Sequence, residues 1–344
     1  MRLLLVGSDK VYAIENFYAR YLREKGIEVF HFSAQSIFYD YYQKSILNKI
    51  VFKSGLSSIL RTINKQFINA VDTFQPDVIW IFKGMEIYPE SLQWAKAKNI
   101  KLVNYNPDNP FIFSGKGSGN ANVKNSIPIY NLHLTYNSAV KKEIEKSYKI
   151  PAAILPFGYD VSEALFNKCS QTKEINKACF LGNPDKFRGV FLQGLAANGI
   201  KLDVFGNNWN KFVGHSNITI HQPVYGDEFW DVLRKYRVQI NLSRPHTQDT
   251  HNMRSFEVPG IGGIQLAPNT DDHTSYFENG KEIFVYDDLE SCTRMINEIV
   301  SFSDDHAAEI RVNAKERSVR SRYSYKDRTD QALAQIEILL SENE

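Results

Sequence analysis

The stretch Asn252-Met-Arg-Ser-Phe-Glu-Val-Pro-Gly-Ile-Gly-Gly-Ile-Gln-Leu-Ala-Pro268 decides the fold of this 344-residue chain. Arg254 and Glu257 are three residues apart, so a helix here places both side chains on one face. A proline and three glycines then end the helix, and the apolar run 264–267 predicts a buried strand. A short helix that carries a cation and a carboxylate between two strands suits a ligand with phosphates and ribose hydroxyls.

Short apolar runs alternate with longer segments of helical periodicity along the chain, which predicts βαβ units and parallel sheets. The predicted strands span residues 2–6, 28–32, 78–82, 101–105, 132–136, 178–181, 202–205, 218–221, 238–242, 264–267 and 282–286. The predicted helices span residues 12–25, 46–73, 89–98, 139–148, 186–198, 226–236, 289–302, 307–320 and 326–340. Prolines at 151 and 156 mark a break. We therefore expect an α/β chain with Rossmann-like domains over 1–160 and 161–325 and a closing segment, 326–344, that crosses back to the first domain.

The second half also carries a family resemblance. The order Arg-x-Phe-Glu, Gly262-Gly263 and Phe277-x-Asn-Gly-Lys-Glu-Ile283 resembles the C-terminal half of group 1 glycosyltransferases, and it is most similar to the branch with the spore-maturation CgeB-like proteins. The segment Arg322–Arg328 resembles the closing Tyr-x-x-Arg of that family. The resemblance covers roughly residues 178–330. It implies a GT-B fold, in which two Rossmann-like domains with parallel sheets face each other across a cleft that holds a nucleotide sugar, and a retaining, hexosyltransferase-like activity.

Spacing alone leaves other two-domain classes open, because dehydrogenases and periplasmic binding proteins also pair two Rossmann-like units. The turn Val6-Gly-Ser-Asp-Lys10 has one glycine and lacks Gly-x-Gly-x-x-Gly, which argues against a nicotinamide site. The opening apolar run is too short for a signal peptide, which argues against a periplasmic protein.

Composition narrows the class further. The chain has 41 basic and 39 acidic residues and a formal charge of +2, so no global charge favours nucleic acid as a partner. Cys169, Cys179 and Cys292 lack metal-ligand spacing and predict reduced thiols in a cytoplasmic protein. The sequence has no apolar run of 18 residues, so it predicts no membrane-spanning helix.

A basic turn follows the first predicted strand of the second half. In Gly182-Asn-Pro-Asp-Lys186-Phe-Arg188, the glycine allows close backbone approach and the helix N-terminus attracts anions. The resemblance implies that Lys186 or Arg188 neutralises the leaving diphosphate. The alternative is that both side chains are solvated in a helix's first turn, where cations are mildly unfavourable without an anion.

For the helix that begins near Arg254, the resemblance implies that Glu257 accepts hydrogen bonds from the two ribose hydroxyls. Arg254 is a second predicted phosphate ligand, because its fork binds two oxygens at once. The alternatives are a macrodipole role for Glu257 and a salt bridge between the two side chains. Asp249 stands where the family usually has a second Glu and is predicted to contact the sugar; the alternative is an Asx-turn.

The rest of the predicted donor site is less specific. Arg244, His246 and His251 lie around Asp249, and one of them is predicted to contact phosphate. Gly206 is predicted to let the backbone approach the nucleotide, and the N–H groups near Gly182, Gly262 and Gly263 are predicted to stabilise the diphosphate. The two histidines lack a third ligand nearby, so we expect no metal and no cofactor, with the nucleotide sugar as substrate.

In the first half, Tyr105-Asn-Pro-Asp-Asn-Pro110 leaves a strand at the edge where α/β ligands bind. Asp108 is therefore a candidate contact for the acceptor or donor sugar; a structural turn is the alternative. The acidic pairs 271–272, 287–288 and 304–305 predict helix caps. The predicted activity is sugar transfer to a glycan, lipid-linked or protein acceptor, with a sugar-nucleotide epimerase and a catalytically silent sugar-binding scaffold as alternatives.

From residue 41 to 71 the chain carries five cations and no acidic residue, among apolar residues at nearly helical spacing. Gly55 predicts a division into two amphipathic helices. One interpretation is a helix pair packed on the sheet with a solvated basic face. The other is peripheral contact with an anionic membrane.

Overall fold

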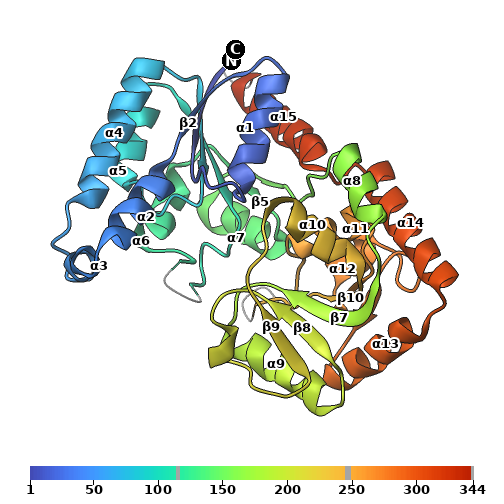
Figure 1. The fold of residues 1–344 in the computed structure, drawn as a ribbon. Helices are drawn as coiled ribbons and strands as arrows, with labels where there is room; N and C mark the ends of the chain where they lie inside the picture. The colour runs from blue at the N-terminus through green and yellow to red at the C-terminus, as the bar shows by residue number, and fades with distance from the viewer. Residues whose placement is uncertain (114–116, 245–248, 342–344) are drawn as a thin grey trace. The chain divides into compact units, whose positions relative to one another are not determined.

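The computed structural model describes residues 1–113, 117–244 and 249–341. The chain divides into two compact units (Figure 1). The first unit combines Met1–Pro156 with the C-terminal segment that begins at Tyr325, and the second is Phe157–Ser324. Each unit has its own parallel sheet and its own apolar core.

In the described part of the first unit, six strands form a parallel sheet in the order β2-β1-β3-β4-β5-β6. Every residue of β3 is buried, because helices cover both faces of such a sheet. The chain crosses between β1 and β3, so the loops after these two strands diverge at that point of the sheet. The strand bounds are β1 (Arg2–Val6), β2 (Glu28–Phe32), β3 (Val78–Phe82), β4 (Lys101–Asn106), β5 (Leu132–Thr135) and β6 (Ala152–Ile154).

The helices of the first unit pack by apolar stripes. In α1, Ile14, Tyr18 and Leu22 recur every four residues and are buried, and α4 buries Ile59 and Ile63 with the same spacing. The bounds are α1 (Ile14–Glu24), α2 (Ala34–Lys44), α3 (Ile46–Lys53), α4 (Ile59–Phe74), α5 (Pro89–Lys96), α6 (Ala121–Ser126), η1 (Ile127–Ile129), α7 (Ser138–Tyr148) and α15 (Tyr325–Ser341).

The last helix, α15, lies beside α1 in the first unit (Figure 1). Tyr325 stacks on Phe17 with ring centroids 4.9 Å apart and meets Tyr18 edge-on at 5.6 Å. Lys25 of the segment after α1 forms an ion pair with Asp330. The first sheet is therefore covered in part by residues from the far end of the chain.

The second unit repeats the architecture. Within its described residues, six parallel strands are ordered β12-β11-β10-β7-β8-β9, with the crossover between β7 and β10. The strand bounds are β7 (Ile175–Leu181), β8 (Leu202–Phe205), β9 (Ile218–His221), β10 (Tyr236–Ile240), β11 (Gln265–Pro268) and β12 (Phe284–Tyr286). The helix bounds are α8 (Glu163–Ser170), α9 (Lys186–Ala197), η2 (Trp209–Lys211), α10 (Gly226–Lys235), α11 (Arg254–Gly260), α12 (Asp271–Tyr276), α13 (Leu289–Ser301) and α14 (Asp304–Arg320).

The α/β fold class predicted from the sequence is confirmed, with two parallel sheets. The helical segment predicted over 46–73 forms two helices, α3 and α4, as its predicted division at Gly55 requires, and Gly55 has a φ of 78° in the turn between them. The strand β6 and the helices α2, α6, α8 and α12 were not predicted. Of the acidic pairs, only Asp288 is itself an N-cap; Thr270 and Ser303 cap the other two helices. Within the described residues, none of the helices is long and apolar enough to cross a membrane.

Candidate functional site

The candidate site of the second unit lies at the point of its sheet where the strand order reverses, between β7 and β10. The strands β7 and β10 are neighbours, and the loops after them leave the same edge of the sheet. In open parallel sheets, ligands bind outside the carboxyl ends of the strands at this switch point. The residues Gly182–Arg188 follow β7, and Asn241–Arg244 follow β10.

Arg188 ties these two loops together. Its Nη1 donates to the Asn183 carbonyl at 3.0 Å, and its Nη2 donates to the Leu242 carbonyl at 2.8 Å. The Asp185 side chain caps α9 by accepting the Arg188 N–H at 2.9 Å. Burial lowers the pKa of Arg188 to about 10, so the group stays a cation at neutral pH. Its buried Nε makes no hydrogen bond among the described residues, and it lies 3.6 Å from Asp185 Oδ2 in an ion pair. Lys186 is exposed in the first turn of the same helix.

Arg254 and Glu257 point the same way from α11, as their spacing predicts. Arg254 Nη1 donates to Glu257 Oε2, and its guanidinium lies over the Phe229 ring at 4.5 Å from the centroid. Glu257 is buried; burial raises the pKa of its carboxyl and Arg254 opposes that rise. The salt bridge named above as the alternative is thus present, and it leaves the buried Arg254 Nε without a hydrogen-bond partner in the described chain.

Positive charge gathers at this edge of the sheet. The charges of Arg244 and Arg254 add to burial in lowering the pKa of Arg188. Arg244 itself is exposed at the end of the β10 loop. Like charges this close disfavour each other, and an anion among them relieves the repulsion. Three separate loops or helices thus contribute cations here, and two of these cations already pair with carboxylates: Arg188 with Asp185 and Arg254 with Glu257.

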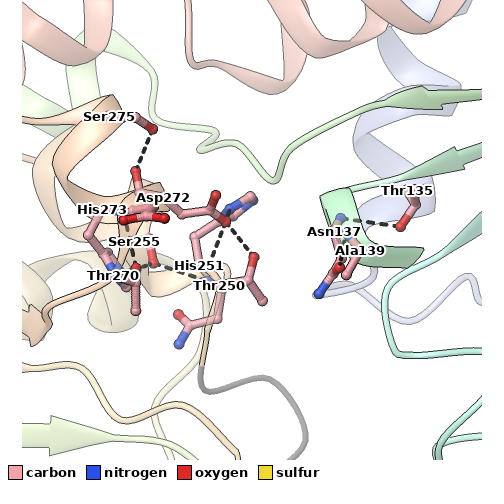
Figure 2. A network of polar contacts seen from close by, with 12 residues as sticks. Thr135, Asn137, Ala139, Thr250, His251, Ser255, Thr270, Asp272, His273 and Ser275 are labelled. Atoms are coloured by element: carbon pink, nitrogen blue, oxygen red, sulfur yellow. Dashed lines mark hydrogen bonds and ion pairs between the residues drawn. The ribbon is translucent and has the colours of Figure 1, made fainter. Parts of the chain in front are cut away.

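A hydrogen-bond network fixes the loop before α11 (Figure 2). The Asp272 carboxylate accepts from Thr250 Oγ1, from the His251 N–H at 3.1 Å, and contacts His251 Nδ1 at 2.7 Å. Burial would raise the pKa of Asp272, but these bonds and the His251 charge lower it to about 2. The side chain of His251 is fully buried and helps to orient the loop, and its predicted phosphate contact stays a prediction. The sequence interpretation missed this role of Asp272, because only the fold brings α12 to residues 250–251.

A second set of bonds joins the loop after β10 to the start of α11. Asn252 Nδ2 donates to Asn241 Oδ1 at 2.7 Å, and Ser255 Oγ lies 2.9 Å from His273 Nε2. Burial lowers the pKa of His273 to about 4, so this imidazole is neutral at pH 7. The Arg254 N–H donates to Asn252 Oδ1 at 2.9 Å. These contacts hold the first turn of α11, and with it Arg254, against β10.

The glycines of the predicted site prove to be packing residues. A Cβ on Gly206, whose φ is 150°, would lie 2.3 Å from the Gly182 carbonyl oxygen and 2.8 Å from Trp209 Nε1. The buried Trp209 donates its indole N–H to that carbonyl at 2.9 Å, so it packs rather than stacks on a ligand. The close approach that Gly206 permits is therefore between two turns of the protein.

The N–H groups of Gly182, Gly262 and Gly263, which were predicted to stabilise a diphosphate, donate to backbone carbonyls instead. Gly262 donates to the Pro259 carbonyl at 2.9 Å and Gly263 to the Val258 carbonyl at 2.8 Å, which ends α11. The Gly182 N–H donates to the Phe205 carbonyl at 3.0 Å. Gly262 and Gly263 stand at the C-terminal end of α11, where carbonyl groups, not N–H groups, are left over. The N–H groups of these three glycines are therefore already used within the protein.

Two predicted residues of the 244–251 loop remain, and the structure describes only Asp249. Asp249 is exposed, next to the fixed pair Thr250 and His251. His246 lies outside the described residues, so its predicted phosphate contact stays a prediction.

In the first unit, Asp108 lies at the carboxyl end of the sheet and forms an ion pair with Lys83 at 2.6 Å. Lys83 follows β3 with a φ of 61°, and its charge acts on two buried carboxyls, Glu15 and Glu86. Burial raises the pKa of each carboxyl to about 7. Glu15 accepts the Ser8 N–H at 3.0 Å, and a Cβ on Gly7 would lie 2.6 Å from its carboxylate oxygen. Glu15, Lys83 and Glu86 thus gather at the β1–β3 switch point, which the sequence interpretation missed; the glycines after β1 and β3 were its one signal.

Searching the described residues for three or more His, Cys, Asp or Glu groups that could hold a metal ion gives none. The prediction that no metal takes part stays a prediction.

The chain is similar to known proteins in sequence and in fold. Residues 188–334 match the family described as glycosyl transferase-like. No curated protein matches the sequence. Among solved structures, the chain is similar to a glycosyltransferase from Rickettsia africae (13% identity, 98% of each chain, TM-score 0.66) and to sucrose-phosphate synthase from Thermosynechococcus elongatus (11%, 99% of this chain and 100% of that chain, 0.68). It is also similar to HepE of Anabaena in complex with UDP-glucose (12%, 98% and 99%, 0.65).

These likenesses establish the fold, which is that of the GT-B glycosyltransferases. The match to the glycosyl transferase-like family covers residues 188–324 of the second unit, including Arg188, Arg254 and Glu257, and the start of α15. The narrower resemblance to CgeB-like proteins is not among these findings.

Proposed function

We propose that the protein transfers a sugar from a nucleotide-sugar donor to a hydroxyl group of a glycan, lipid-linked or protein acceptor. The observation that carries this proposal is the cluster of Arg188, Arg244 and Arg254 around the β7–β10 switch point, with Glu257 on the same helix face as Arg254. Three cations suit a diphosphate, and a carboxylate suits the adjacent ribose hydroxyls. The match of residues 188–334 to a glycosyl transferase-like family supports it.

In this proposal the bond between the anomeric carbon and the diphosphate oxygen breaks, and a bond to the acceptor oxygen forms. The acceptor hydroxyl releases its proton to solvent, and the nucleoside diphosphate departs with the negative charge. The arginines stabilise that charge as it develops, which is electrostatic stabilisation by groups already in place. From the family resemblance we also propose that the reaction proceeds with retention and without a metal ion. In the same proposal, Asp249 and Asp108 contact sugar. The CgeB-like branch is a proposal on the same footing.

Binding of the nucleotide is tested with UDP, the ligand present in a second structure of the similar protein HepE. Calorimetric titration should show UDP binding to the wild type and at least about tenfold weaker binding to Glu257→Ala, because one ribose contact to a charged group is worth about 1.5–3 kcal/mol. The control is Glu290→Ala, since Glu290 lies in the exposed first turn of α13. Equal UDP affinity in Glu257→Ala and the wild type would refute the ribose assignment.

The reaction class is tested by incubating the enzyme with a panel of UDP-, GDP- and TDP-sugars. Release of nucleoside diphosphate supports transfer or slow hydrolysis and identifies the donor. Appearance of an epimeric sugar nucleotide would instead indicate an epimerase, and binding without turnover a silent sugar-binding protein. Addition of EDTA should leave turnover unchanged, and activity restored only by magnesium or manganese would contradict a metal-independent mechanism.

A further inference from the structure

The segment between α2 and β3 has an unusual charge. From residue 41 to 71 it contains Lys44, Lys49, Lys53, Arg61 and Lys65 and no Asp or Glu. All of these cations except the half-buried Lys49 are exposed. Two helices, α3 and α4, make up most of the segment, and the structure separates their roles.

Helix α4 is a core helix. It buries Ile59, Ile63, Phe67 and Val71, which pack in the apolar core of the first unit. These residues also recur at helical spacing in the sequence, and the structure shows that they face the protein. For α4, the interpretation of a helix packed on the sheet with a solvated basic face is therefore correct.

Helix α3 is different, because none of its residues is fully buried. Ile46, Leu47 and Ile50 are 75%, 65% and 57% exposed, and Leu56 in the following turn is 81% exposed. One side of α3 is nevertheless anchored: Phe52 meets Phe38 edge-on at 4.8 Å.

Two polar contacts complete the anchoring of α3. Asn48 Nδ2 donates to the Tyr41 carbonyl at 2.8 Å, and Ser45 caps the helix by accepting the Asn48 N–H at 3.0 Å. The structure thus holds α3 in place, at the end of the first unit beside α2 in Figure 1, while Ile46, Leu47 and Ile50 stay exposed.

We propose that this surface, defined as Ile46, Leu47, Ile50 and Leu56 with Lys44, Lys49 and Lys53 close by in the chain, docks on an anionic lipid bilayer. Apolar side chains that project from a short helix enter the boundary between head groups and acyl chains, and the surrounding cations meet anionic head groups. The two features occur on one segment that lacks any acidic residue to oppose them.

Charge decides between a bilayer and a second copy of the chain. In a symmetric dimer through this surface, each set of cations would face the same set on its partner, because a two-fold interface pairs a patch with itself. That repulsion opposes self-association, whereas an anionic bilayer attracts every one of the cations. The lipid surface is therefore the occupant that fits both the apolar and the charged side chains.

Docking of this kind would bring the enzyme to a lipid-linked acceptor, and only that consequence rests on the proposed function. Binding to lipid itself is independent of sugar transfer. A protein that binds vesicles but turns over no sugar nucleotide would keep this inference and lose the other.

The test is co-sedimentation with vesicles of phosphatidylglycerol and phosphatidylcholine, compared with vesicles of phosphatidylcholine alone. The wild type should pellet with the anionic vesicles at low salt and stay in the supernatant with the neutral ones. Salt at about 1 M, where the Debye length is about 3 Å, should release it. Lys49→Gln with Lys53→Gln should weaken binding by about 25-fold, since each cation contributes roughly fivefold.

The apolar contribution is tested with Ile46→Ser, Leu47→Ser and Ile50→Ser combined, which should weaken binding at least about a hundredfold. Matched controls are Lys142→Gln with Lys146→Gln on the exposed face of α7, and Val312→Ser with Val319→Ser on α14; both should bind as the wild type does. Circular dichroism and the thermal midpoint confirm that each variant is folded.

Three results would overturn the proposal. The wild type does not pellet with anionic vesicles at low salt; the triple serine variant pellets as fully as the wild type; or the α7 control loses as much binding as the α3 lysine variant. Concentration-dependent dimerisation that the triple serine variant abolishes, without binding to vesicles, would assign the surface to a second copy instead.

Discussion

Arg188 has two duties that compete for its five N–H groups. Two of them hold the carbonyls of Asn183 and Leu242, which fixes the β7 and β10 loops relative to each other. Its buried Nε forms an ion pair with Asp185, so the N–H groups of the two terminal nitrogens that hold no carbonyl are the ones left for an anion. Arg254 similarly donates to Glu257, and its buried Nε makes no hydrogen bond within the described residues. Each arginine is thus oriented by protein contacts before a ligand arrives, which limits the reorganisation needed when charge develops.

Arg188→Ala and Arg254→Ala should therefore lower kcat more than they raise KM. A loss of one preorganised charge donor costs about 10²–10³ in kcat, because the diphosphate carries more charge in the transition state than in the bound donor. Steady-state kinetics with the donor found in the sugar-nucleotide panel measure both constants. Lys201→Ala, an exposed lysine before β8, is the control and should change neither. Wild-type kcat in both arginine variants would mean that the diphosphate does not bind at this site.

At the residue scale, sequence spacing was sufficient where a pair lies within one helical turn. Arg254 and Glu257 share a face because they are three residues apart, and the structure places them in contact. Glu15 with Gly7, and Asp272 with His251, come from different elements, and nothing in local spacing links them. Gly206 shows the opposite failure: its need for space was correctly inferred, but the space is occupied by the Gly182 carbonyl.

At the scale of elements, strands were easier to predict than short helices. The bounds of β1, β2, β3, β8 and β9 match the predicted ranges, because each is an apolar or alternating run bounded by polar residues. The helices α8 and α12 are short and have weak apolar periodicity, so packing rather than propensity decides them. The division at Gly55 was predicted, whereas the different burial of α3 and α4 depends on which helix meets the sheet.

The loop between β3 and α5 gives a prediction about pH. Burial raises the pKa of Glu86 from 4.5 to about 7, so the folded state holds a proton that the unfolded chain releases between these values. Stability must then fall as pH rises through this window, and the full cost is present above about pH 7. Glu86→Gln removes the titration, so it should stabilise the first unit at pH 8 by up to about 3 kcal/mol and by little at pH 4.

Urea unfolding at several pH values measures this effect. The control is Glu90→Gln, an exposed residue of α5, which should change stability by less than about 0.5 kcal/mol at either pH. If Glu86→Gln keeps the wild-type slope of stability against pH, then Glu86 is charged in the folded protein at neutral pH.

At the scale of the whole molecule, the first unit is built from both ends of the chain. Residues 1–156 supply its sheet, and α15 adds a helix that packs on α1 after the second unit has been completed. The switch points of the two sheets differ in charge: the second gathers arginines, and the first gathers Lys83 with the buried Glu15 and Glu86. Fold class followed from the alternation of strands and helices, but this difference in charge follows only from which loops each crossover places together.

Because α15 belongs to the first unit, a change in it should be felt there and not in the second unit. Tyr325 is fully buried against Phe17 and Tyr18, so Tyr325→Ala should cost about 3–5 kcal/mol through the cavity it leaves. Hydrogen exchange should rise in peptides of α1 and β1 and stay unchanged in those of β7 and β10. Ile338→Ala, at a position of the same helix that is 53% exposed, should leave both units as they are. Equal loss of protection in the two units would mean that they unfold as one cooperative body, and unchanged protection in α1 would mean that α15 does not stabilise the first unit.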